Sequence, residues 1–208
     1  MAITTYAELQ TAIADDLARS DLTSFIPDFI TMAENVLNYG SEEIEPLRVR
    51  EMETVGTVTM AAGVGTVPTG FLQHIRAVEG TTSRSLLNYI TADAAEKLYP
   101  TRSSGIPTSF SIIGSNLYTY PLTDNSIELT YYSVIPALSG SNTTNWLLTK
   151  APGVYLRAAL VMANGFIKNT AQMSLQAEMA RGLIGGMNRS DMVGKYARAG
   201  LTTRGATP

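Results

Sequence analysis

The first forty residues alternate apolar and polar side chains with the three- and four-residue spacing of amphipathic helices. The apolar face of the first such stretch consists of Tyr6, Leu9, Ile13 and Leu17, and that of the second consists of Phe25, Phe29, Met32, Val36 and Leu37. Other residues mark where these helices begin and end. Thr5 and Glu8 have the spacing of a capping box at the start of the first helix, and Gly40 suits the C-terminus of the second. We therefore expect residues 1–53 to form an N-terminal pair of helices.

From about Thr54 the apolar positions recur every second residue, which is typical of β-strands. The clearest strand places Ile127, Leu129 and Tyr131 on one side of the chain. The turn residues at 114–116 predict a hairpin, and a short helix is expected after Thr91. The pattern predicts an antiparallel β domain over residues 54–145.

After Pro152 the helical spacing returns, and residues 146–186 are expected to form a C-terminal pair of helices. The second of these is predicted to end at the Gly185–Gly186 pair. Residues 187–208 are then expected to form an extended tail arm.

The order of helices, strands and helices predicts an α+β fold, because an alternating α/β fold would interleave the two kinds of element. The simplest packing is a helical bundle built from the N- and C-terminal helix pairs, with the antiparallel β domain inserted between them.

The only tryptophan, Trp146, stands where the predicted β domain ends and the helices resume. A large aromatic side chain at this junction could pack between the two parts and fix their relative angle. An ordinary core tryptophan on a short connection is the equal alternative. We assign Trp146 to packing between the domains.

Charged residues make up only 16% of the chain, against roughly 25% in typical soluble proteins. This is compatible with a surface that is largely covered in an assembly, or with a surface rich in serine and threonine. Residues 189–208 carry four basic side chains and one acidic side chain, which makes this segment a candidate interaction arm on an acidic body.

No signal-peptide pattern or membrane-spanning apolar run is found, so we expect no membrane association.

The residues offer little that suggests catalysis. The chain has no cysteine, and the single histidine, His74, has no partner with the spacing of a triad or a zinc site, so we expect a structural role for it. No phosphate-binding or calcium-binding motif is present. We predict no catalytic residues, no cofactor and no metal ion.

Several stretches resemble the head-to-tail adaptors of tailed bacteriophages, close to the tail tubular protein A class. The sequences concerned are TYAELQTAIADDLARSDLTSFIPDFITMAENVLN, LRVREME, and IELTYYSVIPALSGSNTTNWLLTKAP followed by VYLRAAL. The resemblance covers about residues 4–170, and the NTTNWLLTKAP block is its most specific part.

The resemblance implies a structural, non-enzymatic virion protein, made in the host cytoplasm and located in the neck between capsid and tail. Such adaptors form a ring, commonly of twelve copies, that joins the portal protein to the tail nozzle protein and continues the DNA channel without specific DNA binding. The resemblance also implies that residues 187–208 form an arm that binds the portal. The residues expected to contact the portal and neighbouring subunits are Arg189, Met192, Val193, Lys195, Tyr196, Arg198, Leu201 and Arg204.

Two alternatives belong to other classes. A tail-associated hydrolase would need two carboxylates brought together in a cleft. A DNA-binding accessory factor would bind with a steep dependence on salt concentration, through the basic tail. For an adaptor, we also expect Glu42, Glu43 and Glu45 to lie nearer the channel than the basic tail.

Overall fold

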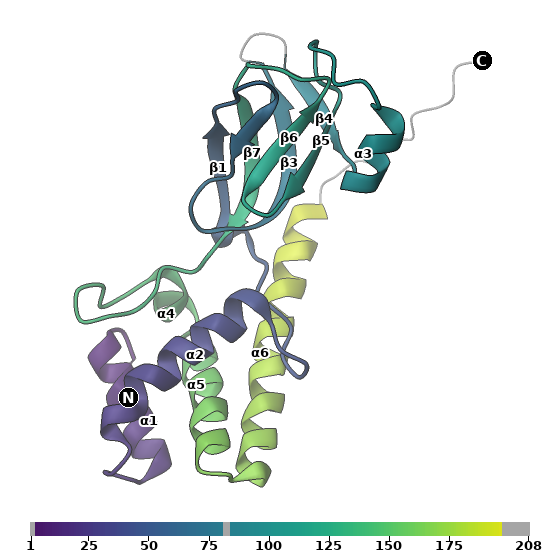
Figure 1. Cartoon of the computed structure of the whole chain (residues 1–208). Coiled ribbons are helices and arrows are strands. Elements are labelled where there is room, and N and C mark those ends of the chain that lie inside the picture. The colour runs from purple at the N-terminus through teal and green to yellow at the C-terminus, as the bar shows by residue number, and fades with distance from the viewer. Residues whose placement is uncertain (1–2, 81–83, 197–208) are drawn as a thin grey trace. The chain divides into compact units, whose positions relative to one another are not determined.

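The structure is a computed structural model that describes residues 3–80 and 84–196 of the chain (Figure 1). It confirms the α+β class. The chain forms two compact units, a helical unit of residues 1–51 and 135–208 and a β unit of residues 52–134. The expected β domain extended from residue 54 to residue 145. Its last part, residues 135–145, belongs instead to the helical unit.

The helical unit consists of α-helices from both ends of the chain and one short 3-10 turn at Thr23–Phe25. These helices are α1 (Tyr6–Leu17), α2 (Ile26–Tyr39), α4 (Trp146–Lys150), α5 (Pro152–Phe166) and α6 (Thr170–Tyr196). Helix α5 is central, because α1, α2, α4 and α6 all pack on it (Figure 1).

The ends of the N-terminal helices follow the sequence signals. The side chain of Thr5 accepts a hydrogen bond from the Glu8 N–H, and the Glu8 carboxylate accepts one from the Thr5 N–H, which completes the expected capping box. Helix α2 ends at Gly40, whose φ of 81° suits glycine. Both expectations are confirmed.

The expected helix end at Gly185–Gly186 is wrong, because α6 continues through the pair to Tyr196. Glycine inside a helix costs only about 1 kcal/mol relative to alanine, and tertiary contacts can outweigh that cost. Ile184 is buried just before the pair, and Asn188 and Asp191 bond to residues 46–50 just after it. The first part of the predicted tail arm, residues 187–196, is therefore helical.

A buried polar network fixes residues 135–145 to the helices. One carboxylate oxygen of Glu34 accepts hydrogen bonds from the Leu138 N–H at 2.8 Å and the Tyr155 hydroxyl at 3.2 Å. The Asn145 amide donates to the Pro136 carbonyl and to Tyr155 Oη, each at 2.7 Å. The backbone polar groups that this irregular segment buries are satisfied in this way.

The β unit contains the helix α3 (Ala92–Leu98) and a seven-stranded curled sheet. The strands are β1 (Glu53–Val58), β2 (Val64–Thr66), β3 (Phe71–Glu79), β4 (Ser85–Tyr89), β5 (Ser109–Ile113), β6 (Asn116–Tyr120) and β7 (Ile127–Ser133). A short 3-10 turn at Arg50–Met52 precedes β1. Thr91 caps α3 as predicted, through a hydrogen bond from the Ala94 N–H.

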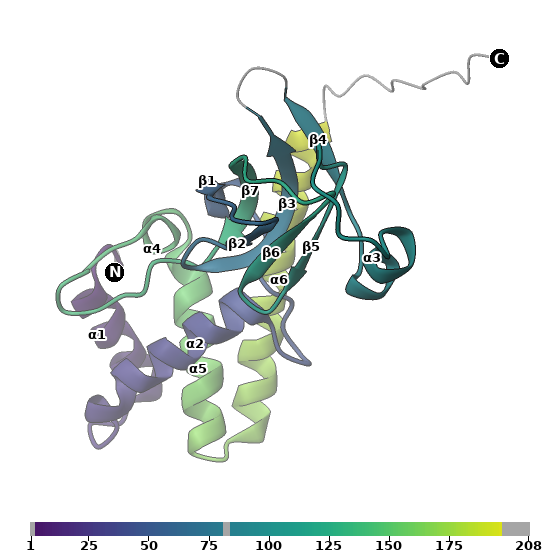
Figure 2. The same cartoon turned by 45° about the horizontal axis from the view of Figure 1, so that its top comes forward.

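The strand order is β1-β7-β3-β4-β5-β6-β2. The strands, including the short β2, are labelled in Figure 2. All neighbouring pairs are antiparallel except β4 and β5, which pair in parallel. The prediction of a wholly antiparallel domain is therefore wrong at this one pair. Helix α3 lies between these two strands in the sequence and supplies the crossover that a parallel pair requires.

The inner face of the curled sheet holds the core of the β unit. Ile127, Leu129 and Tyr131 of β7 all join this core, as the alternation predicted. Strands β1, β3, β4, β5 and β6 add Val58, Ala77, Leu87, Phe110 and Leu117. The predicted hairpin at 114–116 connects β5 and β6, with Ile113 opposite Asn116.

Candidate functional site: the outer surface of α6

The second half of α6 is held by the connector of residues 43–51, which follows α2. The side chain of Asn188 accepts a hydrogen bond from the Arg48 N–H at 2.9 Å and donates one to the Pro46 carbonyl at 3.2 Å. Arg181 donates through Nε to the Glu43 carbonyl at 2.7 Å. These bonds use backbone groups of a segment that has no secondary structure of its own before residue 50.

Asp191 adds a charged contact to the same surface. Its carboxylate is 2.7 Å from Arg50 Nε and 3.3 Å from Lys195 Nζ. Burial alone would raise the pKa of Asp191, but the hydrogen bonds from Arg50 and Lys195 outweigh burial and lower it. Asp191 is therefore a charged anchor between the connector and the last turns of α6.

Replacing Asn188 with alanine is expected to lower the free energy of unfolding by about 1 to 2 kcal/mol, because two backbone groups of the connector lose their partner. Thermal unfolding monitored by circular dichroism measures the change. Ser190→Ala, on the exposed face of the same helix, is the matched control and should change stability by less than about 0.5 kcal/mol. Equal effects of the two substitutions would contradict this role of Asn188.

A groove of about 670 Å³ lies between the connector, α4 and α6. Its walls include Glu51 and Asp191, the two carboxylates that a hydrolase would need in a cleft. The hydrogen bond from Lys150 lowers the pKa of Glu51, and that of Asp191 is lowered too. A glycosidase acid instead requires a raised pKa. The electrostatics of this groove thus disfavour acid–base hydrolysis there.

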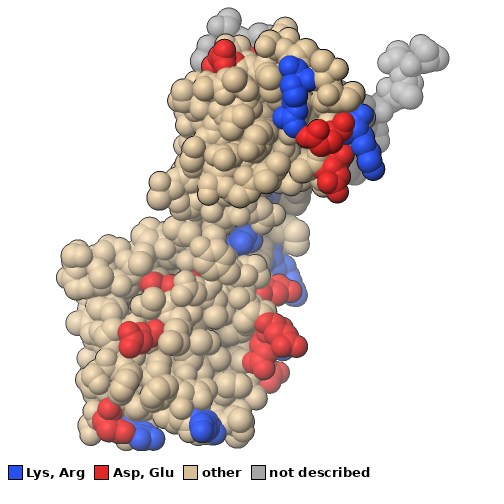
Figure 3. Space-filling view, in the orientation of Figure 1, with Lys and Arg blue, Asp and Glu red and all other residues tan. Residues whose placement is uncertain are grey.

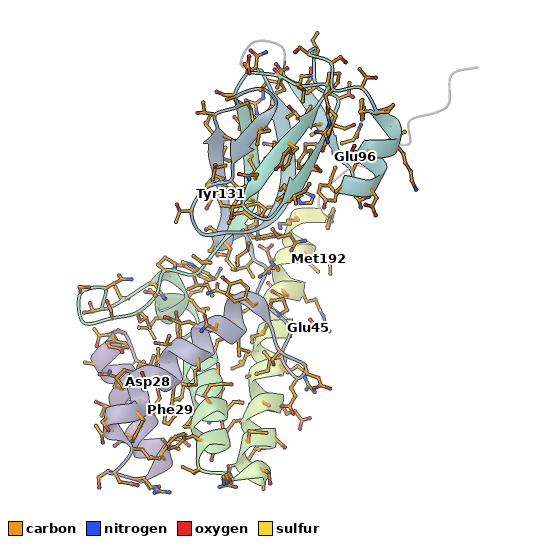
Figure 4. The ribbon with its side chains drawn as sticks, in the orientation of Figure 1. Asp28, Phe29, Glu45, Glu96, Tyr131 and Met192 are labelled. Carbon is orange, nitrogen blue, oxygen red and sulfur yellow. The ribbon has the colours of Figure 1, made fainter. Side chains whose placement is uncertain are left out.

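The residues expected to bind the portal divide into two groups. Arg189, Met192, Val193, Lys195 and Tyr196 lie on the last turns of α6, whereas Arg198, Leu201 and Arg204 lie outside the described residues. Met192, Val193 and Tyr196 are exposed, with 57%, 62% and 67% of their surface accessible, and form an apolar end to the helix. Figure 4 marks Met192 on this part of α6. Lys195 is half-buried and bonds to Asp191.

Asn188 and Asp191, which hold α6 in place, were not among the expected site residues. Because a helix end was expected at Gly185–Gly186, these two residues were expected to lie in the tail arm. A helical signal was present, because Ile184, Asn188 and Asp191 have three- and four-residue spacing along one side of the helix.

Trp146 is the first residue of α4 and is half-buried. The preceding residue, Asn145, caps this helix by accepting a hydrogen bond from the Leu148 N–H. Trp146 belongs to the helical unit. Its assignment to packing between the units stays a prediction.

His74 lies on β3 within an aromatic cluster of the β unit. Its ring stacks on Tyr89, with centroids 4.3 Å apart, and meets the edge of Phe110 at 5.4 Å. Burial lowers the pKa of His74 below its ordinary value, because the neutral ring fits this apolar environment better than the charged ring.

The pKa of His74 predicts a pH dependence for the β unit. Since the folded-state pKa is depressed, the unfolded chain binds the proton more readily, so stability is lost as the pH falls below about 6.5. His74→Phe keeps an aromatic ring and removes the titration. The unfolding temperature of this variant should fall less than that of the wild type when the pH is lowered from 7.5 to 5.5. Differential scanning calorimetry measures both temperatures, and an equal decrease for the two proteins would contradict the prediction.

Charged side chains are sparse over the middle of the face of the helical unit drawn in Figure 3, and acidic and basic groups lie next to each other along its right margin and at its lower left. Among residues 3–80 and 84–196, no group of three or more His, Cys, Asp or Glu side chains could hold a metal ion. The described residues also contain no helix of the length and apolarity needed to cross a membrane.

A family model provides the identification. The SU10 adaptor protein model matches residues 4–204, nearly the whole chain. The chain therefore belongs to the SU10 adaptor protein family, a class of structural, non-enzymatic phage proteins, and the head-to-tail adaptor resemblance is confirmed at this level. A comparison with curated proteins gives no match.

Proposed function

We propose that the protein is the subunit of an adaptor ring that connects the portal of a tailed phage to its tail nozzle and lines the DNA channel. The observation that carries this proposal is the adaptor family match over residues 4–204. The family implies partners in the phage neck, namely the portal and tail proteins. We propose twelve copies, as is common in rings of this kind.

The portal arm of this proposal begins on the last turns of α6. The exposed side chains of Met192 and Tyr196 supply an apolar contact to the portal, whereas Arg189 and Val193 contact a neighbouring subunit. Arg198, Leu201 and Arg204 continue the arm outside the described residues. Apolar and aromatic side chains beside arginine are the groups that carry most binding energy at protein interfaces.

The channel wall of this proposal is acidic. Glu42 directly precedes the connector, Glu43 and Glu45 lie in it, and all three are exposed; Figure 4 marks Glu45. Like charges disfavour adhesion, so an acidic wall would let DNA pass without specific binding. Ring structures that place Arg198 and Arg204 along the channel instead would overturn this part.

Co-expression with the portal protein of the same phage tests the proposal. The two proteins should sediment together, and native mass spectrometry of the complex should give twelve adaptor chains per portal ring. Separate sedimentation of the two proteins at every ratio would refute the portal partnership. Hydrolysis of peptidoglycan by the purified chain would favour the alternative of a tail-associated hydrolase.

A further inference from the structure

Two helices of the helical unit have an outer face whose side chains are exposed. On α2, the buried residues Phe29, Ile30 and Ala33 lie on the side toward α5. Asp28, Met32, Asn35 and Tyr39 recur every three or four residues on the opposite side, and all four are exposed. Met32 and Tyr39 leave 51% and 67% of their surface accessible, so two large side chains project from this face. The expected place of Met32 on the apolar face with Phe29 is therefore wrong.

Helix α6 has an outer face of the same kind. Its buried residues Gln176, Ala177, Ala180 and Ile184 lie toward α5. The opposite side carries Leu175, Met179, Gly182, Leu183, Gly186 and Val193, all exposed. Leu175, Met179 and Leu183 each leave 44% of their surface accessible.

The two faces have complementary shapes. Large side chains project from α2 at Met32 and Tyr39, whereas α6 presents Gly182 and Gly186, where an added Cβ would meet nothing within 4 Å. The same two glycines form a wall of two grooves, of about 670 and 490 Å³, that run along this part of α6. Small residues allow a second helix to approach closely, so projecting side chains from another helix can fill such a gap.

The two outer faces also carry one pair of opposite charges. Asp28 is the acidic residue of the α2 face, and Arg189 is a basic residue of the α6 face, where Glu45 and Glu178 line the same groove. Arg189 lies beside Gly182 and Gly186 on the outer face of α6, and Asp28 lies near the start of the α2 face (Figure 4). An antiparallel arrangement of the two helices brings Asp28 toward the part of α6 that carries Arg189.

We propose that the outer face of α2 in one copy docks on the outer face of α6 in the next copy. The two helices then cross where Asn35 of the first copy lies near Gly186 of the next. This inference rests on the proposed ring and names its subunit interface. The two faces differ, so the contact is heterologous, and a contact of this kind closes into a ring when its rotation divides a full turn.

Disulfide trapping tests this contact directly, because the chain has no cysteine of its own. The full-length double variant Asn35→Cys/Gly186→Cys is oxidised with and without the portal and run on a non-reducing gel. We expect a ladder of covalently linked chains. Gly140→Cys/Gly186→Cys is the matched control, since Gly140 is also exposed with open space at its Cβ, and it should stay a single chain.

A charge exchange adds a measurement that needs no cross-link. Arg189→Glu and Asp28→Arg are each expected to weaken association between copies roughly tenfold, and the double variant should recover most of the loss. Both positions are exposed, so the variants should fold. Absence of any recovery in the double variant would contradict the pairing of these two residues.

The outcomes separate the interface from the adaptor role. A ring on the portal seen by electron microscopy without a ladder would overturn the interface and leave the adaptor role intact. A ladder without any ring on the portal would support the interface and overturn the portal role. Neither a ring nor a ladder would overturn both. Cross-linking of Gly186→Cys to a portal cysteine instead would assign the α6 face to the portal.

Discussion

Replacing Glu34 with alanine is expected to destabilise the helical unit by about 3 kcal/mol. The substitution leaves the Leu138 N–H and the Tyr155 hydroxyl without their acceptor in a buried site, and each loss of this kind costs about 1 to 3 kcal/mol. Chemical denaturation followed by circular dichroism measures the change. Ser174→Ala, at an exposed position of α6 in the same unit, is the control and should alter stability by less than about 0.5 kcal/mol.

The conservative variant Glu34→Gln separates the acceptor from the charge. Burial raises the pKa of Glu34 in spite of its two hydrogen bonds. A raised folded-state pKa means that this group stabilises the fold fully below its unfolded value of about 4.5 and loses that contribution as the pH rises through the folded value. The stability of Glu34→Gln relative to the wild type should therefore increase from pH 4.5 to 7.5. A constant difference would show that Glu34 does not titrate in this way.

Two truncations are expected to have different effects, because α6 continues past the glycine pair. Ending the chain after Tyr196 keeps every described contact between α6 and the connector, so stability should change by less than about 0.5 kcal/mol. Under the proposed function, the same truncation should weaken portal binding about 100-fold, because Arg198, Leu201 and Arg204 are lost.

Ending the chain after Gly186 should also destabilise the helical unit by about 2 to 4 kcal/mol, since the contacts of Asn188 and Asp191 are lost as well. Calorimetry and a portal-binding assay on the same samples separate the two effects. If the chain ending at Tyr196 bound the portal as tightly as the full chain, the portal contact would have to lie outside residues 197–208.

Local signals predicted the helix starts and the strand faces. The capping box of Thr5 and Glu8, the Thr91 cap and the alternation of Ile127, Leu129 and Tyr131 all depend on neighbours within a few residues, which a sequence displays directly. The short helix α4 was not among the predicted helices, because the helical spacing was expected to return only after Pro152.

Features that depend on distant partners could not be predicted. The parallel pairing of β4 and β5 follows from how the whole sheet curls, and nothing within either strand specifies it. The continuation of α6 past Gly185 depends on bonds to a connector about 140 residues earlier in the chain. The acceptor role of Glu34 for Leu138 also spans about 100 residues.

Function was accessible from the sequence only through resemblance. Composition and motifs pointed away from known catalytic sites but did not select a ring subunit over other binding proteins. The outer faces of α2 and α6 became visible only once packing on α5 had shown which sides of these helices are covered.

Electron microscopy of the full-length protein mixed with the portal ring of its phage tests the adaptor role most directly. The proposed function predicts a ring of adaptor subunits on one end of the portal, coaxial with its channel, with residues 197–208 against the portal. A chain that stays unassembled in the presence of the portal, or that binds it only at scattered positions, would contradict the proposal.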